Sequence, residues 1–335
     1  MSDRMPGRKA HSNPPRPTAS PNQGRTSAAS AQPPTVSLRW LAAAIGVTIV
    51  AAAVCAWGAL CLMVWQGSWQ LLYHPTAAVT RTPAGAGLPF DSIGFATTEA
   101  GLPRLKGWWI PAPPGAVNSR YTALYLHGAT GNLGDSVDEL YRLHAAGLNV
   151  LAFDYRGYGG SQFVHPSEDR WRQDAEWALQ YLTGTRHVAA KSIVLVGSGL
   201  GANLALEVAA AHSNLAGVVL DEPLAAPANA IFADPRTRLV PARALVRDRW
   251  NSNASAVALH IPSLWFYFTA APGIVSLSAK PELFQKAPSP KMLFWLISTR
   301  ESNADFANAL SRWLSDLPNH GRDLPVCQLS DGLTC

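Results

Sequence analysis

Residues Lys191–Ala211 read KSIVLVGSGLGANLALEVAAA, and this stretch decides the fold. Ser192–Val196 is a short apolar run rich in β-branched residues, which predicts a strand. Beyond it, leucine, valine and alanine recur at helical intervals, so the hydrophobic period changes across a glycine-rich turn. Gly197 and Gly201 lie two residues before and two residues after position 199, where a sharp turn needs residues without bulk. The sequence therefore predicts a strand that runs directly into a helix.

The spacing of these glycines matches the G-x-S-x-G motif of a nucleophile elbow, except that its apex is Gly199 instead of serine. If Ser198 were the apex, the flanking positions would be Val196 and Leu200, whose side chains would crowd the turn. We therefore interpret Ser198 as the neighbour and Gly199 as the site of a missing nucleophile. An ordinary glycine-rich turn and a phosphate-binding loop are the alternatives, although the downstream lysine and hydroxyl of a P-loop are absent.

Length and charge point to one large domain with appendages. The chain has 335 residues, of which 48% are apolar, enough for one sizeable core. Its net charge of +5 resides mostly in residues 1–38, which hold five basic residues and one acidic residue, so the remainder is close to neutral at +1. We expect no nucleic-acid partner, because this balance supplies no electrostatic footprint. Residues 1–38 are rich in Pro, Ser and Ala without periodicity, which predicts a disordered basic tail.

No charged residue occurs from Trp40 to Trp65. As a helix, the stretch Leu41–Trp65 would be roughly 38 Å long, which exceeds the ~30 Å hydrocarbon core of a bilayer. We predict a transmembrane helix over residues 39–66, with membrane contact through residues 40–65. The basic tail would lie in the cytoplasm and the domain outside it, which is the periplasm for a bacterial inner membrane. A buried globular helix and a cleaved signal peptide, whose apolar region is only about 7–15 residues, are the alternatives.

Cysteine usage agrees with that orientation only weakly. Cys55 and Cys61 lie inside the predicted span, whereas Cys327 and Cys335 close the chain. The last two either pair in an oxidising compartment or remain free thiols on the terminus. No Cys/His spacing is typical of a metal site, so we expect neither a metal nor a cofactor.

After the span, short apolar strands alternate with helical segments. The expected strands cover residues 90–98, 105–110, 121–126, 149–153, 192–196, 215–220, 263–268 and 292–297, and the expected helices include 136–146, 168–182 and 305–314. This alternation predicts an α/β fold with a mostly parallel sheet covered on both faces by helices. We place the domain at 67–318, with a lid insertion at 224–257 and a C-terminal extension at 319–335.

Four segments of the chain occur in a characteristic order: LLYHP at 71–75, LYLHGATGNLG at 124–134, LAFDYRGYGGSQ at 151–162 and VLVGSGLGANLAL at 194–206. In this order they resemble the α/β-hydrolase superfamily, and within it the membrane-anchored bud-emergence-type branch of serine hydrolases. The resemblance covers most of residues 69–316. It implies the α/β-hydrolase fold and ester hydrolysis by a serine, which a histidine and an acid on later loops assist.

The residues that would perform this chemistry are substituted. By the resemblance, the acid follows the strand 263–268, but Thr269–Val275 contains no carboxylate. The base follows the strand 292–297, but Ser298–Asp305 contains no histidine, and His320 lies beyond the last helix. With glycine at position 199, all three triad positions are empty. This pattern predicts a catalytically degenerate pseudohydrolase with a binding or scaffolding role.

The frame of an oxyanion hole remains. By the resemblance, the backbone N–H groups of the Gly128–Ala129 loop and of Leu200 would form it, whatever their side chains. The alternative is an active esterase, thioesterase or lipase with a displaced set of Ser198, Asp221 and His127. His127 is otherwise a structural loop histidine, and Asp221 otherwise caps a loop.

The sequence does not identify the ligand, whether the protein is a pseudohydrolase or an active hydrolase. A pocket for an acyl chain or a small ester is expected, while the sequence indicates no particular protein partner. The lid carries five arginines that either steer an anionic ligand or lipid headgroup or form a solvated face: Arg236, Arg238, Arg243, Arg247 and Arg249.

Overall fold

The computed structural model describes residues 36–268, 281–288, 290–296, 302–317, 326–329 and 333–334. It divides into two compact units, Met1–Ala53 and Val54–Cys335. This boundary falls inside the predicted span 39–66, within helix α1 (Leu38–Gly67). The C-terminal turns of α1 belong to the second unit because Val64 is buried in its core. The limits predicted for the tail, lid and extension remain predictions.

Helix α1 is apolar on every side. The stretch Leu38–Leu71 is long and apolar enough to cross a membrane, with a mean hydropathy of 2.4 in its most apolar window. Large apolar side chains such as Ile45, Val50 and Val54 are exposed in spite of this composition. Lipid is the solvent that suits such a surface, since the backbone polar groups are satisfied within the helix itself.

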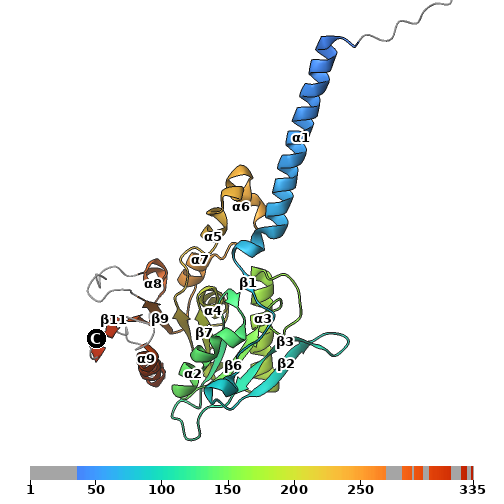
Figure 1. The fold of residues 1–335 in the computed structure, drawn as a ribbon. Coiled ribbons are helices and arrows are strands. Elements are labelled where there is room, and N and C mark those ends of the chain that lie inside the picture. Colours follow the sequence, from blue (N-terminus) through green and yellow to red (C-terminus); the bar gives the residue numbers. More distant parts are fainter. Residues whose placement is uncertain are drawn as a thin grey trace, which may run out of the picture. The chain divides into compact units, whose positions relative to one another are not determined.

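Within the described residues, the second unit is built on a ten-stranded sheet of order β12-β11-β10-β9-β8-β7-β4-β6-β3-β2 (Figure 1). Its strands are β2 (Asp91–Thr97), β3 (Pro103–Ile110), β4 (Thr122–Leu126), β6 (Asn149–Asp154), β7 (Ile193–Ser198), β8 (Gly217–Asp221), β9 (Ser263–Phe268), β10 (Lys291–Leu296), β11 (Val326–Leu329) and β12 (Leu333–Thr334). The pairs that join β6, β4, β7, β8, β9, β10 and β11 are parallel, whereas β2, β3 and β12 pair antiparallel. The parallel centre confirms the predicted fold class.

Helices cover both faces of this sheet. One buried cluster joins the sheet to α2 (Val137–Ala145) and α9 (Ser302–Asp316). The other joins it to α3 (Glu168–Gln180), α4 (Leu200–Ala211), α7 (Ser252–Val257) and α8 (Glu282–Lys286). Because side chains alternate along a strand, Leu195 faces the α3/α4 side, while its neighbours Val194 and Val196 face the α2/α9 side. We refer to these as the α3/α4 face and the α2/α9 face.

Short elements fill the connections. A two-stranded parallel pair joins β1 (His74–Pro75) to β5 (Thr130–Gly131) and so ties the end of the span to the loop after β4. Between β8 and β9, the predicted lid contains α5 (Asn229–Phe232), η6 (Pro235–Leu239), α6 (Ala242–Leu245) and α7. The remaining short turns of helix are η1 (Ser68–Leu71), η2 (Pro83–Ala86), η3 (Leu133–Ser136), η4 (Tyr181–Thr185) and η5 (Ala190–Ser192).

Local sequence explains where the main helices begin. The Ser167 hydroxyl accepts a hydrogen bond from the Arg170 N–H and so caps α3. Asn132 and Asp135 form a reciprocal capping box at η3, directly before α2. Helix α4 has no such side-chain cap, because its N-cap residue is Gly199. That helix therefore begins with unsatisfied N–H groups at the predicted elbow.

Candidate functional site

The turn between β7 and α4 has its apex at Gly199. The backbone there adopts φ +55° and ψ −122°, a conformation that residues with a side chain seldom occupy. Two hydrogen bonds hold it: the Gly199 N–H donates to the Asp221 carbonyl at 2.8 Å, and the Ala202 N–H donates to the Gly199 carbonyl at 3.0 Å. The strained geometry is thus a property of the strand–helix junction, present without a serine.

The three glycines of the turn serve different needs. A methyl group added at Gly197 would overlap the Gly201 carbonyl, and one added at Gly201 would overlap the carbonyls of Leu126 and His127. Both positions therefore require glycine for close backbone approach. A methyl group at Gly199, in contrast, would meet no atom within 4 Å. The apex therefore has open space for a side chain, although glycine carries none.

The loop that would supply an oxyanion-hole amide lies against this turn. An added Cβ at Gly128 would lie 3.5 Å from the Ser198 carbonyl oxygen, which places the loop beside the elbow. Leu200 is the first residue of α4, so its N–H has no acceptor within the helix. The Ala129 carbonyl accepts hydrogen bonds from the His74 N–H and the Tyr158 hydroxyl, which anchor the loop. Gly128, Ala129 and Leu200 thus lie together, and their role as anion-binding amides remains a prediction.

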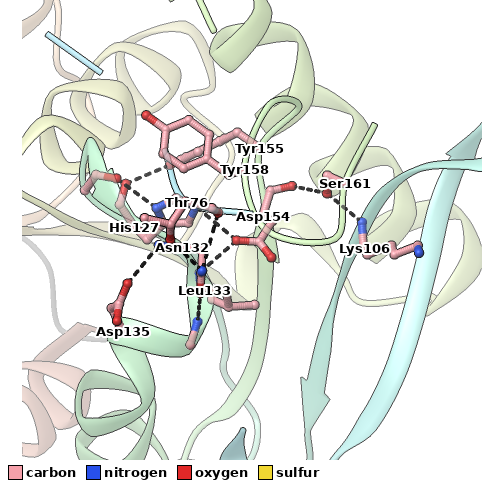
Figure 2. A network of polar contacts seen from close by, with 12 residues as sticks. Thr76, Lys106, His127, Asn132, Leu133, Asp135, Asp154, Tyr155, Tyr158 and Ser161 are labelled. Atoms are coloured by element: carbon pink, nitrogen blue, oxygen red, sulfur yellow. Dashed lines mark hydrogen bonds and ion pairs between the residues drawn. The ribbon is translucent and has the colours of Figure 1, made fainter. Parts of the chain in front are cut away.

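His127 is buried in an aromatic cluster on the α3/α4 face (Figure 2). Its ring lies 4.5 Å from that of Tyr155, 5.2 Å from that of Tyr158 and 6.3 Å from that of Trp171. Nδ1 lies 2.8 Å from the Gly128 carbonyl oxygen, and since a carbonyl only accepts, Nδ1 carries the proton. Burial lowers the pKa of His127 to about 4, so the ring is neutral at physiological pH.

The second ring nitrogen of His127 faces a carboxyl group. Nε2 lies 3.7 Å from Asp154 Oδ1 and has no hydrogen-bond partner among the described residues. The same carboxyl oxygen accepts the Leu133 N–H at 2.7 Å (Figure 2). Burial raises the pKa of Asp154 to about 6. Sequence reasoning did not single out Asp154, and the signal available was its place at the end of a buried strand, before a glycine-rich turn.

Ser198 and Asp221 lie together on the other face. They are register partners at the ends of β7 and β8, and both line a cavity of about 10 Å³ with Tyr125, Arg142 and Phe306. That is the α2/α9 face. Burial raises the pKa of Asp221 to about 7, and its Oδ1 has no hydrogen-bond partner in the described part of the chain. The structure therefore brings Ser198 and Asp221 together, whereas His127 packs on the opposite face.

The other predicted positions fall outside the described residues. These are the acid position at 269–275, His320, Cys335 and residues 298–301 of the base position. Residues 302–305 of that segment form the start of α9, and Cys327 belongs to β11. Within the described ranges, no group of three or more His, Cys, Asp and Glu side chains is arranged to hold a metal ion.

A doubly covered, mostly parallel sheet with a strand–elbow–helix at its centre defines the α/β-hydrolase fold class. The family model for serine aminopeptidase S33 matches residues 118–293, which is more than half of the chain. The chain belongs to this family.

Related proteins agree with the assignment. The chain is 30% identical over 230 residues to the uncharacterized protein YfhR of Salmonella typhi, with coverage of 67% of this chain and 71% of the relative. It is 31% identical over 160 residues to the uncharacterized membrane protein YNL320W of Saccharomyces cerevisiae, with coverage of 45% and 53%. Among solved structures, the esterase Pf2001 of Pyrococcus furiosus is similar at a TM-score of 0.53 and 20% identity, with coverage of 72% and 98%. This last likeness concerns the fold.

Proposed function

We propose that this chain is a membrane-anchored pseudohydrolase, which uses the α/β-hydrolase frame to bind or scaffold and does not turn over esters. One observation carries the proposal: the elbow apex is Gly199, in the strained backbone conformation and with open space above it. A hydroxyl nucleophile is absent from the position where this family geometry presents one. Loss of the triad in a serine hydrolase costs on the order of 10⁶ in turnover, while an oxyanion hole and a pocket alone retain about 10³–10⁴ over water.

The ligand proposed for this frame is an acyl chain or a small ester. The space above Gly199 and the amides of Leu200 and the Gly128–Ala129 loop support that choice, because such amides suit a carbonyl or carboxylate oxygen. The similarity of the fold to the esterase Pf2001 is consistent with a ligand that contains a carbonyl group. No reacting side chain is required for this binding.

An active hydrolase with a displaced set is the second candidate. The observation in its favour is the pair of Ser198 and Asp221, whose carboxyl pKa of about 7 suits a general base. Against it, the cavity that they share holds about 10 Å³, which is room for one water molecule and not for an ester. The His127 ring lies in a different cluster.

We also propose that α1 anchors the protein with its basic N-terminal tail in the cytoplasm and the domain on the other side. The long apolar helix and the similarity to a yeast membrane protein support membrane attachment. The orientation rests on the basic residues before the span.

Covalent labelling tests the pseudohydrolase proposal. The full-length chain in detergent is treated with a fluorophosphonate probe and assayed with short-chain esters, beside Ser198→Ala and Gly199→Ser, with an active esterase as positive control. We expect no labelling of the parent or of either variant, with circular dichroism confirming that each is folded. Gly199→Ser stays unlabelled because its hydroxyl would lack a base and an acid.

Two results would contradict this expectation in distinguishable ways. Labelling of the parent that disappears in Ser198→Ala would establish Ser198 as a displaced nucleophile. Labelling of Gly199→Ser alone would show that a working base survives and that only the nucleophile has been lost.

A further inference from the structure

A groove lies where the apolar helix meets the domain, far along the chain from the elbow. It encloses about 580 Å³ and is lined by Met63, Trp65, Trp69, Gln70, His165 and Arg247, among others. A second cavity of about 180 Å³ shares Trp65, Trp69, His165 and Arg247 and adds Arg170. Both cavities lie within the second compact unit, which starts at Val54. We call the two together the exit groove.

Aromatic rings and cations alternate along this groove. The Arg247 guanidinium lies 5.0 Å from the centre of the Trp65 ring, and the His165 ring stacks on Trp69 with 4.7 Å between centroids. Arg170 Nη1 donates to the His165 carbonyl at 2.7 Å. This hydrogen bond holds the loop that carries His165, and it keeps the Arg170 guanidinium in the same groove as that of Arg247. The groove therefore combines positive charge with apolar walls.

The cation of Arg247 is available to a ligand. Arg247 is exposed and forms no ion pair with any carboxylate in the described part of the chain. Asp248 also lines the smaller cavity, but its carboxyl group hydrogen-bonds the Tyr73 hydroxyl. The Asp234 carboxylate likewise binds Arg236 at 2.9 Å. An anion is the ligand that this arrangement lacks.

With α1 as the membrane span, the groove is expected at the depth of the lipid headgroups. A hydrocarbon core of ~30 Å corresponds to about 20 helical residues, so a span that starts at Leu41 leaves the core near residue 61. Trp65 and Trp69 then fall in the interfacial region, where tryptophan is enriched. The lid is held beside the same helix, because the Trp57 indole N–H donates to the Leu239 carbonyl at 3.0 Å.

We propose that the exit groove binds the phosphate-bearing headgroup of an anionic phospholipid from the membrane that α1 crosses. Arg247 would pair with the phosphate, His165 and Gln70 would donate hydrogen bonds, and the glycerol and first acyl carbons would lie against Met63 and Trp65. A phospholipid fits better than a free anion, because the groove also presents apolar side chains, among them Met63, Trp65 and Trp69. This site does not depend on the chemistry at Gly199.

Lipid retention by the full-length chain tests the proposal. The protein is purified in detergent, delipidated, exposed to equal amounts of phosphatidylglycerol and phosphatidylcholine, and examined by native mass spectrometry. We expect preferential retention of phosphatidylglycerol, reduced about fivefold in Arg247→Gln, since one basic residue near a membrane surface has about that effect on anionic-lipid affinity. Arg238→Gln is the matched control, because Arg238 is an exposed lid arginine that is not among the groove residues. It should retain the lipid as the parent does.

Competition separates a lipid site from a free-anion site. Inorganic phosphate and glycerol phosphate, added in excess, should leave the retained phosphatidylglycerol in place. Equal losses in Arg247→Gln and Arg238→Gln would overturn the proposal in favour of diffuse surface charge. Unchanged retention in both variants, or full displacement by inorganic phosphate, would overturn it as well. None of these outcomes bears on whether Gly199 or Ser198 is labelled by a fluorophosphonate.

Discussion

Asp221 is a buried carboxyl group whose protonation depends on the folded state. Burial raises its pKa to about 7, whereas an unfolded chain leaves it near its ordinary value of 3.8. Between these two pH values, the folded protein binds a proton that the unfolded chain has released. The free energy of unfolding that Asp221 contributes therefore falls as the pH rises through about 4 to 7. Above about pH 7, Asp221 is ionised in both states, so its contribution to the free energy of unfolding no longer changes with pH.

Asp221→Asn isolates this effect. We expect the parent to lose stability relative to the variant between about pH 4 and pH 7, by a total on the order of 4 kcal/mol across the full window, at ~1.4 kcal/mol per pKa unit. The groups common to both proteins, such as His127 and Asp154, cancel in the difference. Denaturant unfolding at several pH values measures it. Parallel stability curves for the two proteins would show that Asp221 is ionised in the folded state at all of these pH values.

At the scale of single residues, the sequence identified the candidate site residues but not where their side chains lie in the fold. Glycine at position 199, where the G-x-S-x-G motif has serine, is visible in the sequence itself. The direction of His127 is not, because it depends on how the loop turns after Leu126 and on contacts with Tyr155, Tyr158 and Trp171. The alternative of a displaced catalytic set groups Ser198, Asp221 and His127, which come from three separate segments of the chain. Only the sheet geometry separates its members onto two faces.

At the scale of elements, the strand–elbow–helix unit makes a prediction about two of its glycines. Gly199→Ala places a methyl group in open space but in a strained backbone conformation, which costs about 1–3 kcal/mol. Gly201→Ala places one against the Leu126 carbonyl, so the backbone must shift. We expect Gly201→Ala to lower the free energy of unfolding more than Gly199→Ala, despite the better helix propensity of alanine.

Thermal and denaturant unfolding of the full-length chain in detergent measure both variants. Gly46→Ala is a suitable control, because an added methyl group there meets nothing within 4 Å and Gly46 lies inside α1. A larger loss for Gly199→Ala than for Gly201→Ala would mean that dihedral strain, and not close packing, dominates the elbow.

Most elements were predictable because their signals are local. The strands β4, β6, β7 and β9 are runs of apolar residues between turn residues, and the structure has them within two residues of the expected bounds. The pairing of β1 with β5 was missed, since two residues carry no periodicity. The expected helix 168–182 corresponds to α3, which ends at Gln180, and to the start of the π-helical turn Tyr181–Thr185 that directly follows it.

At the scale of the whole molecule, the orientation across the membrane is open to direct measurement. We expect Val117→Cys, at a position that is 87% exposed in the domain, to react with a membrane-impermeant maleimide on intact cells. Ser20→Cys, in the basic tail, should react only after permeabilisation, because the positive-inside rule keeps that tail in the cytoplasm. Cys327→Ser and Cys335→Ser remove background labelling outside the span. The reverse pattern would place the domain in the cytoplasm.

The fold class and the long apolar helix, a candidate membrane span, followed from the sequence because each rests on an extended pattern. The first is the alternation of strands and helices, and the second is the 26 consecutive residues from Trp40 to Trp65 without charge. The exit groove did not follow. It requires Trp65 to meet Arg247, which lies 182 residues later in the sequence, and the nearby contact between Trp57 and Leu239 has the same sequence separation. Contacts between residues so far apart in the sequence leave no local sequence pattern from which they could be predicted.

The geometry of Gly199 bears on serine hydrolases that carry their nucleophile on such a turn. In this chain the elbow adopts φ +55° and ψ −122° with no side chain to demand it. The close contacts of Gly197 and Gly201 therefore shape the junction. A serine at the apex of such a turn would adopt a backbone conformation that these contacts already impose. Comparison of Gly199→Ser with the parent would measure, in one protein, how much folding stability an enzyme forgoes to present its nucleophile.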